Sequence, residues 1–190
     1  MIGWVMSLRT DLPVVNLGRY ELRTIVKEDY LDYYEIGSDE QTVKHLNWGP
    51  FTKPKEALWC IEEIFLKRPL NGLPAGYAIV DKENEYKMIG MIDFHTYYDG
   101  INTAEIGYIL NRSYWNRGIM KQCLKQMTRI GFELLELDKI LVGHTLGNQA
   151  SKQVIIQSGY HYEYQSLIKI KNHERIAMYY SLYRYEYERK

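Results

Sequence analysis

The stretch of residues 104–120, AEIGYILNRSYWNRGIM, constrains the fold of this chain most, because it predicts a strand, a turn and the start of a long helix in direct succession. Residues 104–110 are rich in side chains that favour strands. Apolar residues at steps of three and four predict the helix: Met120, Cys123, Leu124, Met127, Ile130 and Leu134. A strand that leads directly into a helix indicates a sheet covered by helices.

The loop between them, residues 116–120, lies where a helix exposes its first unpaired N–H groups. These donors and the positive end of the helix dipole favour an anion. Gly118 permits a close approach of the backbone, and Arg112 and Arg117 add positive charge suited to a pyrophosphate. Plain turn chemistry is the commoner explanation of a single glycine at a helix start, and the arginines also fit a solvated surface. The three-glycine dinucleotide fingerprint and the P-loop motif are absent, which disfavours those two nucleotide folds.

Five segments of the chain resemble one family. Residues 105–110 (EIGYIL) and 114–120 (YWNRGIM) resemble the acetyl-CoA motif of the GNAT N-acetyltransferases, and the likeness is closest to the ribosomal-protein N-terminal (alanine/serine) acetyltransferase branch. Residues 20–25 (YELRTI) resemble the opening strand of that branch. Residues 148–160, from NQAS to SGY, resemble its second CoA segment, and residues 180–182 (YSL) its last strand. The likeness spans residues 18–188.

Three positions depart from the superfamily pattern. The loop usually reads Gln or Arg, two residues, Gly, one residue, then Gly or Ala, whereas Trp115 and Met120 stand at its first and last positions here. Both replacements fit the ribosomal branch. Many members place a catalytic Tyr four residues before the Gly of the second segment. That position is Ile155, so this general acid is missing from its usual place.

The expected fold class is α/β (α+β), with a mixed, mostly antiparallel central sheet of about seven strands and helices on both faces. Strands are expected at residues 20–26, 75–80, 88–98, 104–110, 139–144, 160–171 and 175–188. Helices are expected at residues 27–36, 52–66, 120–134 and 148–158, the last capped by Asn148 and ended by Gly159. The resemblance implies a splay between the fourth and fifth strands, which holds the acyl thioester.

Length and composition limit the organisation and the partners. The 190 residues are expected to form one domain, 1–190, with residues 1–18 as a leader of uncertain order. Twenty-four basic residues balance twenty-four acidic ones, which argues against direct nucleic-acid or membrane binding. Residues 1–5 are too short for a secretory apolar segment, so a cytoplasmic protein is expected, as a monomer or homodimer. Cys60 and Cys123 lie in apolar helical patterns, and no spacing indicates a metal site.

Candidate bases lie on three of the expected strands. Glu105 starts the motif strand and shares a face with Gly107 and Ile109. The resemblance implies an acidic residue at this position near the acceptor, although a salt-bridged strand-end Glu fits the sequence equally well. His95 and Asp93 share a face of the preceding strand, and His144 ends the strand on the other side of the splay. Histidine accepts protons near neutral pH, but a structural, hydrogen-bonded histidine is the commoner case.

Further site residues follow from the resemblance. It implies that the Ser151 hydroxyl lies near the CoA sulfur, while a first-turn Ser is also ordinary helix capping. Tyr180 is a candidate acid from the last strand, with a packing role as the commoner alternative. For acetyl-CoA, and CoA as product, we expect mainly backbone contacts, to the pantetheine arm at the strand edge and to the pyrophosphate at the helix start. The expected cofactor-binding residues are Ile109, Leu110, Arg112, Trp115, Asn116, Arg117, Gly118, Ile119, Met120, Asn148 and Ser151.

Two classes of function compete. The first is an acetyl-CoA-dependent N-acetyltransferase that acts on a primary amine, either a protein N-terminus, such as that of a ribosomal protein, or a small molecule. The second is a non-catalytic acyl-CoA-binding module, which the absence of a Tyr at Ile155 keeps open. Glu105 discriminates between them: a carboxylate beside the thioester favours catalysis, and a surface ion pair favours binding alone.

Overall fold

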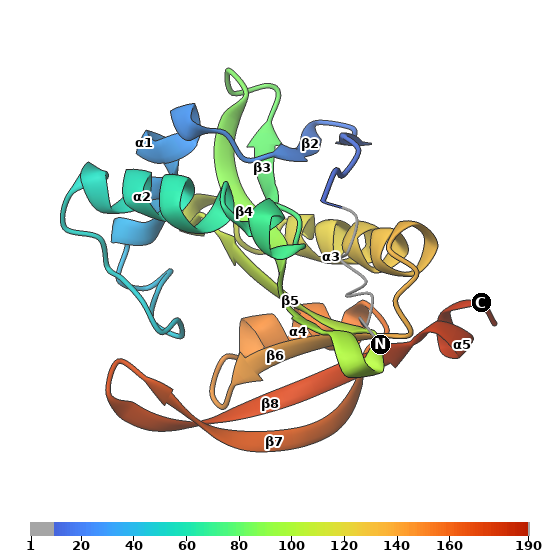
Figure 1. The fold of residues 1–190 in the computed structure, drawn as a ribbon. Coiled ribbons are helices and arrows are strands. Elements are labelled where there is room, and N and C mark those ends of the chain that lie inside the picture. The colour runs from blue at the N-terminus through green and yellow to red at the C-terminus, as the bar shows by residue number, and fades with distance from the viewer. Residues whose placement is uncertain (1–9, 190) are drawn as a thin grey trace.

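The computed structural model describes residues 10–189 and contains one sheet of eight strands (Figure 1). The spatial order of the strands is β1-β2-β3-β4-β5-β6-β8-β7. Their bounds are Val15–Leu17 for β1, Tyr20–Thr24 for β2, Tyr77–Asp81 for β3, Lys87–Tyr98 for β4, Thr103–Leu110 for β5, Lys139–Thr145 for β6, His161–Ile170 for β7 and His173–Tyr183 for β8. All neighbours pair antiparallel except β5 and β6, which are parallel, so the expected mixed and mostly antiparallel sheet is confirmed.

The seven expected strands are all present, and β1 is an additional one. It falls inside the expected leader, where Val15 pairs with Leu22 of β2. Residues 1–9 of that leader lie outside the described residues. The expected final strand is too long, because Arg184–Tyr187 form the short helix α5. The Glu186 carboxylate accepts a hydrogen bond from the backbone N–H of Tyr183 at 2.9 Å, which caps this helix and ends the strand.

The four expected helices are present with altered ends. They are α1 at Tyr30–Ser38, α2 at Pro54–Cys60, α3 at Ile119–Arg129 and α4 at Gln149–Gln157. A 3₁₀ turn, Lys27–Asp29, precedes α1, and π-helical turns, Ile61–Phe65 and Ile130–Leu134, continue α2 and α3. These turns make up most of the difference from the expected ranges.

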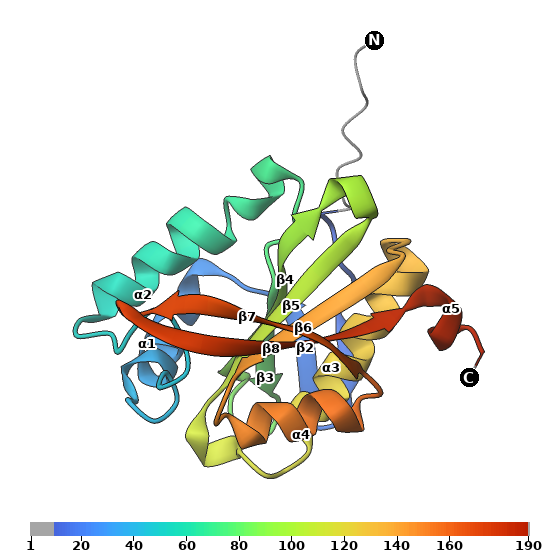
Figure 2. The same ribbon diagram turned by 90° about the horizontal axis from the view of Figure 1, so that it is seen from below.

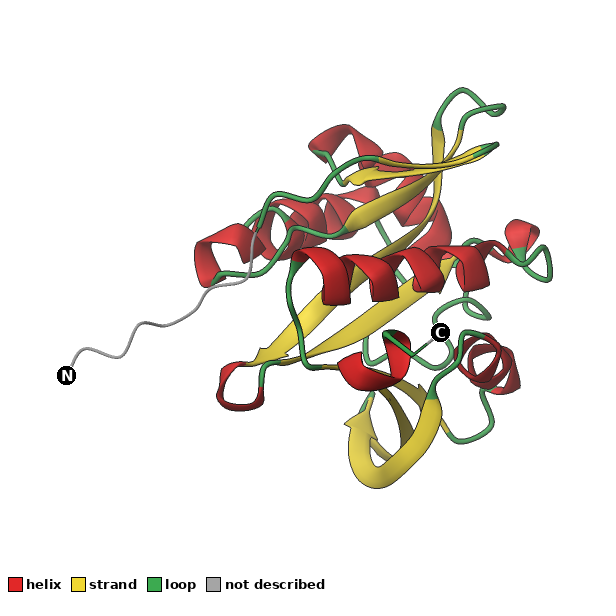
Figure 3. Ribbon diagram, turned by 90° about the vertical axis from the view of Figure 1, so that its right-hand side faces the viewer, coloured by secondary structure: helices red, strands yellow, loops and turns green. Residues whose placement is uncertain are grey.

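Helices cover both faces of the sheet (Figure 3), and the core consists of two clusters of buried side chains, one on each face. Strand β3 shows the division, because Ala78 and Val80 pack against the cluster of α1 and α2, while Tyr77 and Ile79 pack with α3. Such alternation is the signature of a strand covered on both sides. The expected helices on both faces are therefore confirmed.

The splay lies between β5 and β6. These strands pair only from Thr103 with Lys139 to Ile106 with Val142. Beyond that point β5 continues beside β4, as far as Leu110 opposite Gly90, and β6 continues beside β8. The two strands therefore part after Ile106 and Val142, between the same two strands as the resemblance implied.

The β7–β8 hairpin reaches towards the loop that joins α1 to α2 (Figure 2). Lys171 at the hairpin turn donates a hydrogen bond to the backbone carbonyl of Val43 at 3.3 Å. In the same loop, Nδ1 of His45 lies 2.8 Å from the hydroxyl of Thr145 at the end of β6. The α1–α2 loop, β6 and the β7–β8 hairpin thus meet near the end of β6, beyond the part of that strand that pairs with β5.

Candidate functional site

The loop before α3 has the backbone shape of an anion site. Gly118 is the N-cap of α3 and has a φ of 73°, and Asn116 has a φ of 60°. Glycine and asparagine are the residues that adopt this left-handed conformation most readily. A methyl group built on Gly118 would meet no atom within 4 Å, so the space in front of the helix start is open. An uncrowded glycine before the unpaired first N–H groups of a helix is the backbone arrangement that suits an anion.

The side chains of this loop are largely engaged in its own structure. Arg112 forms an ion pair with Asp39 at 3.0 Å, and Arg117 donates to the Ser113 carbonyl at 2.7 Å. The indole of Trp115 donates to the carbonyl of Leu110 at 2.8 Å. The Leu110 carbonyl is thus already bonded within the chain. In the ladder to β4 the Asn111 N–H donates to the Ile89 carbonyl at 2.8 Å, so Ile109, two residues earlier, turns its backbone groups towards Met91. The splay edge of β5 therefore offers the backbone of Tyr108 and the N–H of Leu110. The loop contributes mainly backbone groups to the site.

Two residues of the loop face the core instead. Ile119 and Met120 are 1% and 5% exposed and belong to the α3 cluster. Their side chains therefore anchor the helix start, and only their N–H groups remain for an anion. This explains how Met can stand where the superfamily has Gly or Ala.

Side chains of β5 point alternately to the two faces of the sheet. We call the face with Glu105, Gly107 and Ile109 the Glu105 face, and the face with Ile106 and Tyr108 the Tyr108 face. Ile109 packs with α1 and α2, whereas Ile106 packs with α3. The two faces thus correspond to the two helical layers.

On the Glu105 face, the carboxylate of Glu105 lies in a half-enclosed position beside the splay, and its side chain is 13% exposed. Nε2 of His95 lies 3.6 Å from one carboxylate oxygen, and the hydroxyl of Tyr98 donates to the other at 3.3 Å. A methyl group built on Gly143 of β6 would lie 3.6 Å from the same carboxylate. Glu105 therefore lies next to the strand on the far side of the splay, and not on an outer surface.

His95 and Asp93 lie over Gly107, as their shared face predicted. A Cβ on Gly107 would come within 2.7 Å of Cδ2 of His95 and 3.3 Å of Oδ1 of Asp93. Burial lowers the pKa of His95, but the hydrogen bond to Glu105 and the charges of Asp93 and Glu105 outweigh it, so the pKa is raised overall. Asp93 forms an ion pair with Arg68, which offsets its charge. Glu105 is thus the acid of this group with no Lys or Arg partner among the described residues.

Three tyrosines complete the Glu105 face: Tyr98, Tyr164 and Tyr179. The rings of Tyr164 and Tyr179 stack at 4.7 Å. Burial, followed by the charge of Glu105, raises the pKa of Tyr179 to about 12. Sequence analysis did not single out these tyrosines, because Tyr98 of β4 is far along the chain from the two in the β7–β8 hairpin, and because tyrosine is common throughout the sequence. They form a neutral aromatic wall beside the carboxylate.

On the Tyr108 face, the hydroxyl of Tyr108 lies 2.7 Å from the Ser151 hydroxyl in the first turn of α4. Asn148 caps α4 as predicted, its side chain accepting a hydrogen bond from the Ser151 N–H at 3.2 Å. Burial raises the pKa of Tyr108 to about 12, so the phenol stays protonated at neutral pH. Sequence analysis missed Tyr108, although it lies within the motif and two residues after Ile106.

His144 and Tyr180 form a second group on this face. Their rings stack with centroids 5.5 Å apart, and Tyr180 also meets Tyr162 edge to face. Ile155, at the usual position of the catalytic Tyr, is fully buried in the α3 cluster. Of the expected catalytic residues, the structure therefore brings Glu105 and His95 together on one face, and places Ser151 with Tyr108 on the other.

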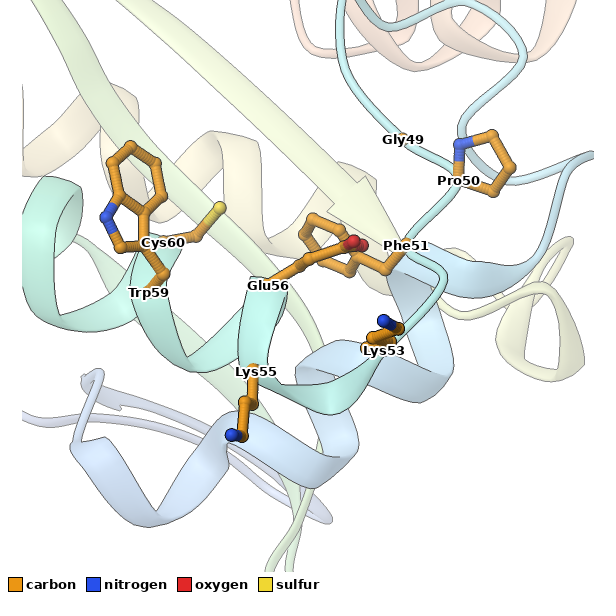
Figure 4. A pocket seen from close by; sticks show the side chains of 8 residues that line it. All are labelled: Gly49, Pro50, Phe51, Lys53, Lys55, Glu56, Trp59 and Cys60. Atoms are coloured by element: carbon orange, nitrogen blue, oxygen red, sulfur yellow. The ribbon is translucent and has the colours of Figure 1, made fainter.

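A shallow hollow of about 400 Å³ lies beside α2 (Figure 4). Phe51, Trp59 and Cys60 are among the residues that line it, with Lys53, Lys55 and Glu56 around it. None of the expected catalytic or cofactor-binding residues lines this hollow. It is therefore separate from the candidate site.

Among residues 10–189, no group of three or more His, Cys, Asp or Glu side chains is arranged to hold a metal ion. Cys60 and Cys123 are both free thiols, and burial raises the pKa of Cys123 to about 12. No helix in this part of the chain is long and apolar enough to cross a membrane.

Comparisons with known proteins agree with this geometry. Residues 19–161 match the family described as Acetyltransferase (GNAT) domain. Uncharacterized N-acetyltransferase p20 of Bacillus licheniformis is 30% identical over 122 residues, which are 64% of this chain and 67% of that protein. The ribosomal-protein-serine acetyltransferase of Escherichia coli (strain K12) is 26% identical over 149 residues, covering 74% of this chain and 78% of that protein.

A solved structure has the same fold. The spermidine N-acetyltransferase from Vibrio cholerae in complex with CoA and spermine superposes with a TM-score of 0.75, over 90% of this chain and 98% of that one, at 14% identity. A splayed sheet with an open helix start beside it defines the acetyltransferase class of fold. The chain belongs to the GNAT acetyltransferase family and is an N-acetyltransferase.

Proposed function

We propose that this N-acetyltransferase uses acetyl-CoA to acetylate a primary amine by direct attack within a ternary complex, and that its acceptor is the α-amine of a protein N-terminus. The observation that carries the mechanism is the placement of Glu105 and Ser151 on opposite faces of one splay. Acetyl-CoA supplies an acetyl group activated as a thioester. The residues around the splay have to hold the reactants and move protons.

The splay and the helix start fit such a ligand. The open space before Gly118 and the N–H groups of α3 suit a pyrophosphate. The edge of β5 beyond Ile106 has no β6 partner, so the backbone of Tyr108 and the N–H of Leu110 are available to a pantetheine arm lying in the splay. This arrangement directs the reactive end of the ligand towards the closed end of the splay, where Glu105 lies.

On the Glu105 face, the carboxylate takes the proton that the amine loses on attack. His95 orients this carboxylate through its contact at 3.6 Å, and the Tyr98 hydroxyl donates to it. On the Tyr108 face, the Ser151 hydroxyl stabilises the negative charge that develops on sulfur, and Tyr108 fixes its position. Ile155 supplies no hydroxyl, so Ser151 takes over the role that Tyr has in many relatives.

Two observations favour a protein N-terminus over a polyamine. An α-amine, with a pKa of about 7.7, needs less help to lose its proton than an amine of pKa about 10.4. A polyamine also carries further ammonium groups that call for further carboxylates, whereas Tyr98, Tyr164 and Tyr179 line the wall beside Glu105. The Escherichia coli relative is named as a ribosomal-protein-serine acetyltransferase, which points to the same acceptor class.

The test is a thiol-release assay with acetyl-CoA and three acceptor classes: ribosomal-protein N-terminal peptides, polyamines and aminoglycosides. We expect turnover with the peptides and a peptide product that carries one additional acetyl group at its α-amine by mass spectrometry. Turnover with polyamines alone would overturn the acceptor assignment. Binding of CoA without turnover on any acceptor would instead favour a non-catalytic acyl-CoA-binding module.

A further inference from the structure

Three exposed cations gather where the tip of the β7–β8 hairpin meets the α1–α2 loop (Figure 2). They are Lys44 of the loop, Lys171 at the hairpin turn and Arg175 near the start of β8. The side chain of Lys171 donates a hydrogen bond to the backbone carbonyl of Val43, which directly precedes Lys44. We call these three residues the basic patch.

The basic patch has no acidic partner within the chain. Among residues 10–189, no Asp or Glu forms an ion pair with any of its three members. Asp39 of the same loop pairs with Arg112, and Glu163 of the same hairpin pairs with Lys139. Glu174 precedes the arginine of the patch, but it points to the other face of the sheet because side chains alternate along a strand.

The imidazole of His45 shows that the charges of the patch lie together. Burial and the positive charges of Lys44, His144 and Arg175 lower the pKa of His45. Its Nδ1 lies 2.8 Å from the hydroxyl of Thr145, which fixes the loop to the end of β6. Like charges held side by side repel one another, and an opposite charge from outside relieves that repulsion. The patch therefore suits an anionic ligand.

The basic patch lies on the same face of the sheet as Glu105. A Cβ on Gly143 would lie 3.1 Å from the ring of Tyr179 and 3.6 Å from the Glu105 carboxylate, so Tyr179 is next to Glu105. Arg175 precedes Tyr179 by four residues in β8 and points to the same face. Four residues of a strand span about 13 Å, and an extended peptide has the same rise. A peptide with its α-amine at Glu105 can therefore bring its fourth residue, or one soon after it, to the patch.

We propose that the basic patch binds acidic side chains of the acceptor, at about its fourth to sixth residue, and so selects acidic protein N-termini. This inference rests on the proposed peptide acceptor and narrows its class. The first residues of the peptide contact the tyrosines beside Glu105, and the acidic residues that follow contact the cations. A polyamine, in contrast, is repelled by the same cations.

The test uses three peptides that differ only at these three positions, which carry glutamate, glutamine or lysine, built on a peptide that the wild-type enzyme acetylates. In the thiol-release assay we expect kcat/KM for the glutamate peptide to exceed that for the glutamine peptide by about 3- to 30-fold, mainly through KM, because exposed ion pairs contribute modestly and in sum. The preference should shrink as the salt concentration rises from about 0.05 M to about 0.5 M.

The double variant Lys44→Glu/Arg175→Glu should reverse the preference, so that the lysine peptide becomes the best substrate. A gain of activity on that peptide also shows that the variant is folded. Lys125→Glu/Arg189→Glu makes the same change in net charge at two exposed positions outside the patch and is the matched control. It should keep the wild-type order of the three peptides.

Equal kcat/KM for the three peptides in the wild-type enzyme would overturn the role of the basic patch and leave the proposed function intact. Absence of turnover with every peptide would overturn the proposed function itself. Fluorescence anisotropy with a labelled single-stranded RNA separates a further outcome. RNA binding that only the patch variant loses, with no discrimination among the peptides, would assign the patch to nucleic acid and overturn its role in acceptor choice.

Discussion

The two faces of the sheet at the splay are built from different chemistry. On the Glu105 face, an acid and an imidazole lie 3.6 Å apart, with the Arg68–Asp93 ion pair close by. On the Tyr108 face, a phenol bonds to a serine hydroxyl, and an imidazole stacks on a second phenol. A carboxylate can take the proton of an amine, whereas hydroxyl donors can stabilise a departing thiolate. The group suited to take the proton and the groups suited to stabilise the thiolate therefore lie on different faces of the sheet, at the same splay.

Among the tests of this division between the two faces, Glu105→Gln should have the largest effect. The amide has the same shape but cannot take a proton, so kcat should fall about 100-fold or more while the affinity for CoA changes little. Steady-state kinetics and calorimetry measure the two quantities. Glu133→Gln, whose carboxylate bonds to Arg129 and Tyr187, is the matched control. A fall in kcat of less than about tenfold would remove Glu105 from the role of base.

Gly107→Ala disturbs the Glu105 face by steric means. The new Cβ would lie 2.7 Å from Cδ2 of His95, so the imidazole that contacts Glu105 must shift. We expect a loss of about 1–3 kcal/mol in the free energy of unfolding and a lower kcat, with a smaller effect on CoA affinity. Gly100→Ala adds the same methyl group where no atom lies within 4 Å, and should leave both quantities unchanged. If both substitutions changed the free energy of unfolding and kcat equally, His95 would not limit the space available at residue 107.

Tyr108→Phe and Ser151→Ala together test the other face. Each variant removes one partner of the same hydrogen bond, so each should lower kcat/KM by about two- to tenfold. Because Tyr108 acts through Ser151, the double variant should be no worse than about the poorer single variant. Tyr185→Phe, at an exposed position, is the control for loss of a phenol. Simple multiplication of the two single effects would show that Tyr108 does not position Ser151.

The sequence predicts features formed by residues close together in the chain better than contacts between residues far apart in it. The strand, loop and helix of residues 104–120 and the cap at Asn148 are local features, and the structure contains them. The Tyr108–Ser151 bond joins residues 43 positions apart, and Arg112 pairs with Asp39 of the loop after α1. Neither contact has a local signal. The register shift in the β4–β5 ladder between Phe94 and Thr96, which places His95 beside Glu105, arises from strand pairing that periodicity does not reveal.

The smallest expected effect concerns the pH dependence of stability. The pKa of His95 is raised in the folded protein above its ordinary 6.5, so protonation of His95 favours folding. The stabilisation is therefore fully present below about pH 6.5 and is lost as pH rises through the raised value. Because the His95 side chain is 35% exposed, solvent screening limits the contribution to about 1 kcal/mol or less, or about 2–4 °C in Tm.

Thermal unfolding of wild-type and His95→Gln from about pH 5 to about pH 9 should give a Tm difference that is largest in acid. His161→Gln, an exposed histidine, should show no such trend, and a difference that grows at alkaline pH would rule out a stabilising His95–Glu105 ion pair.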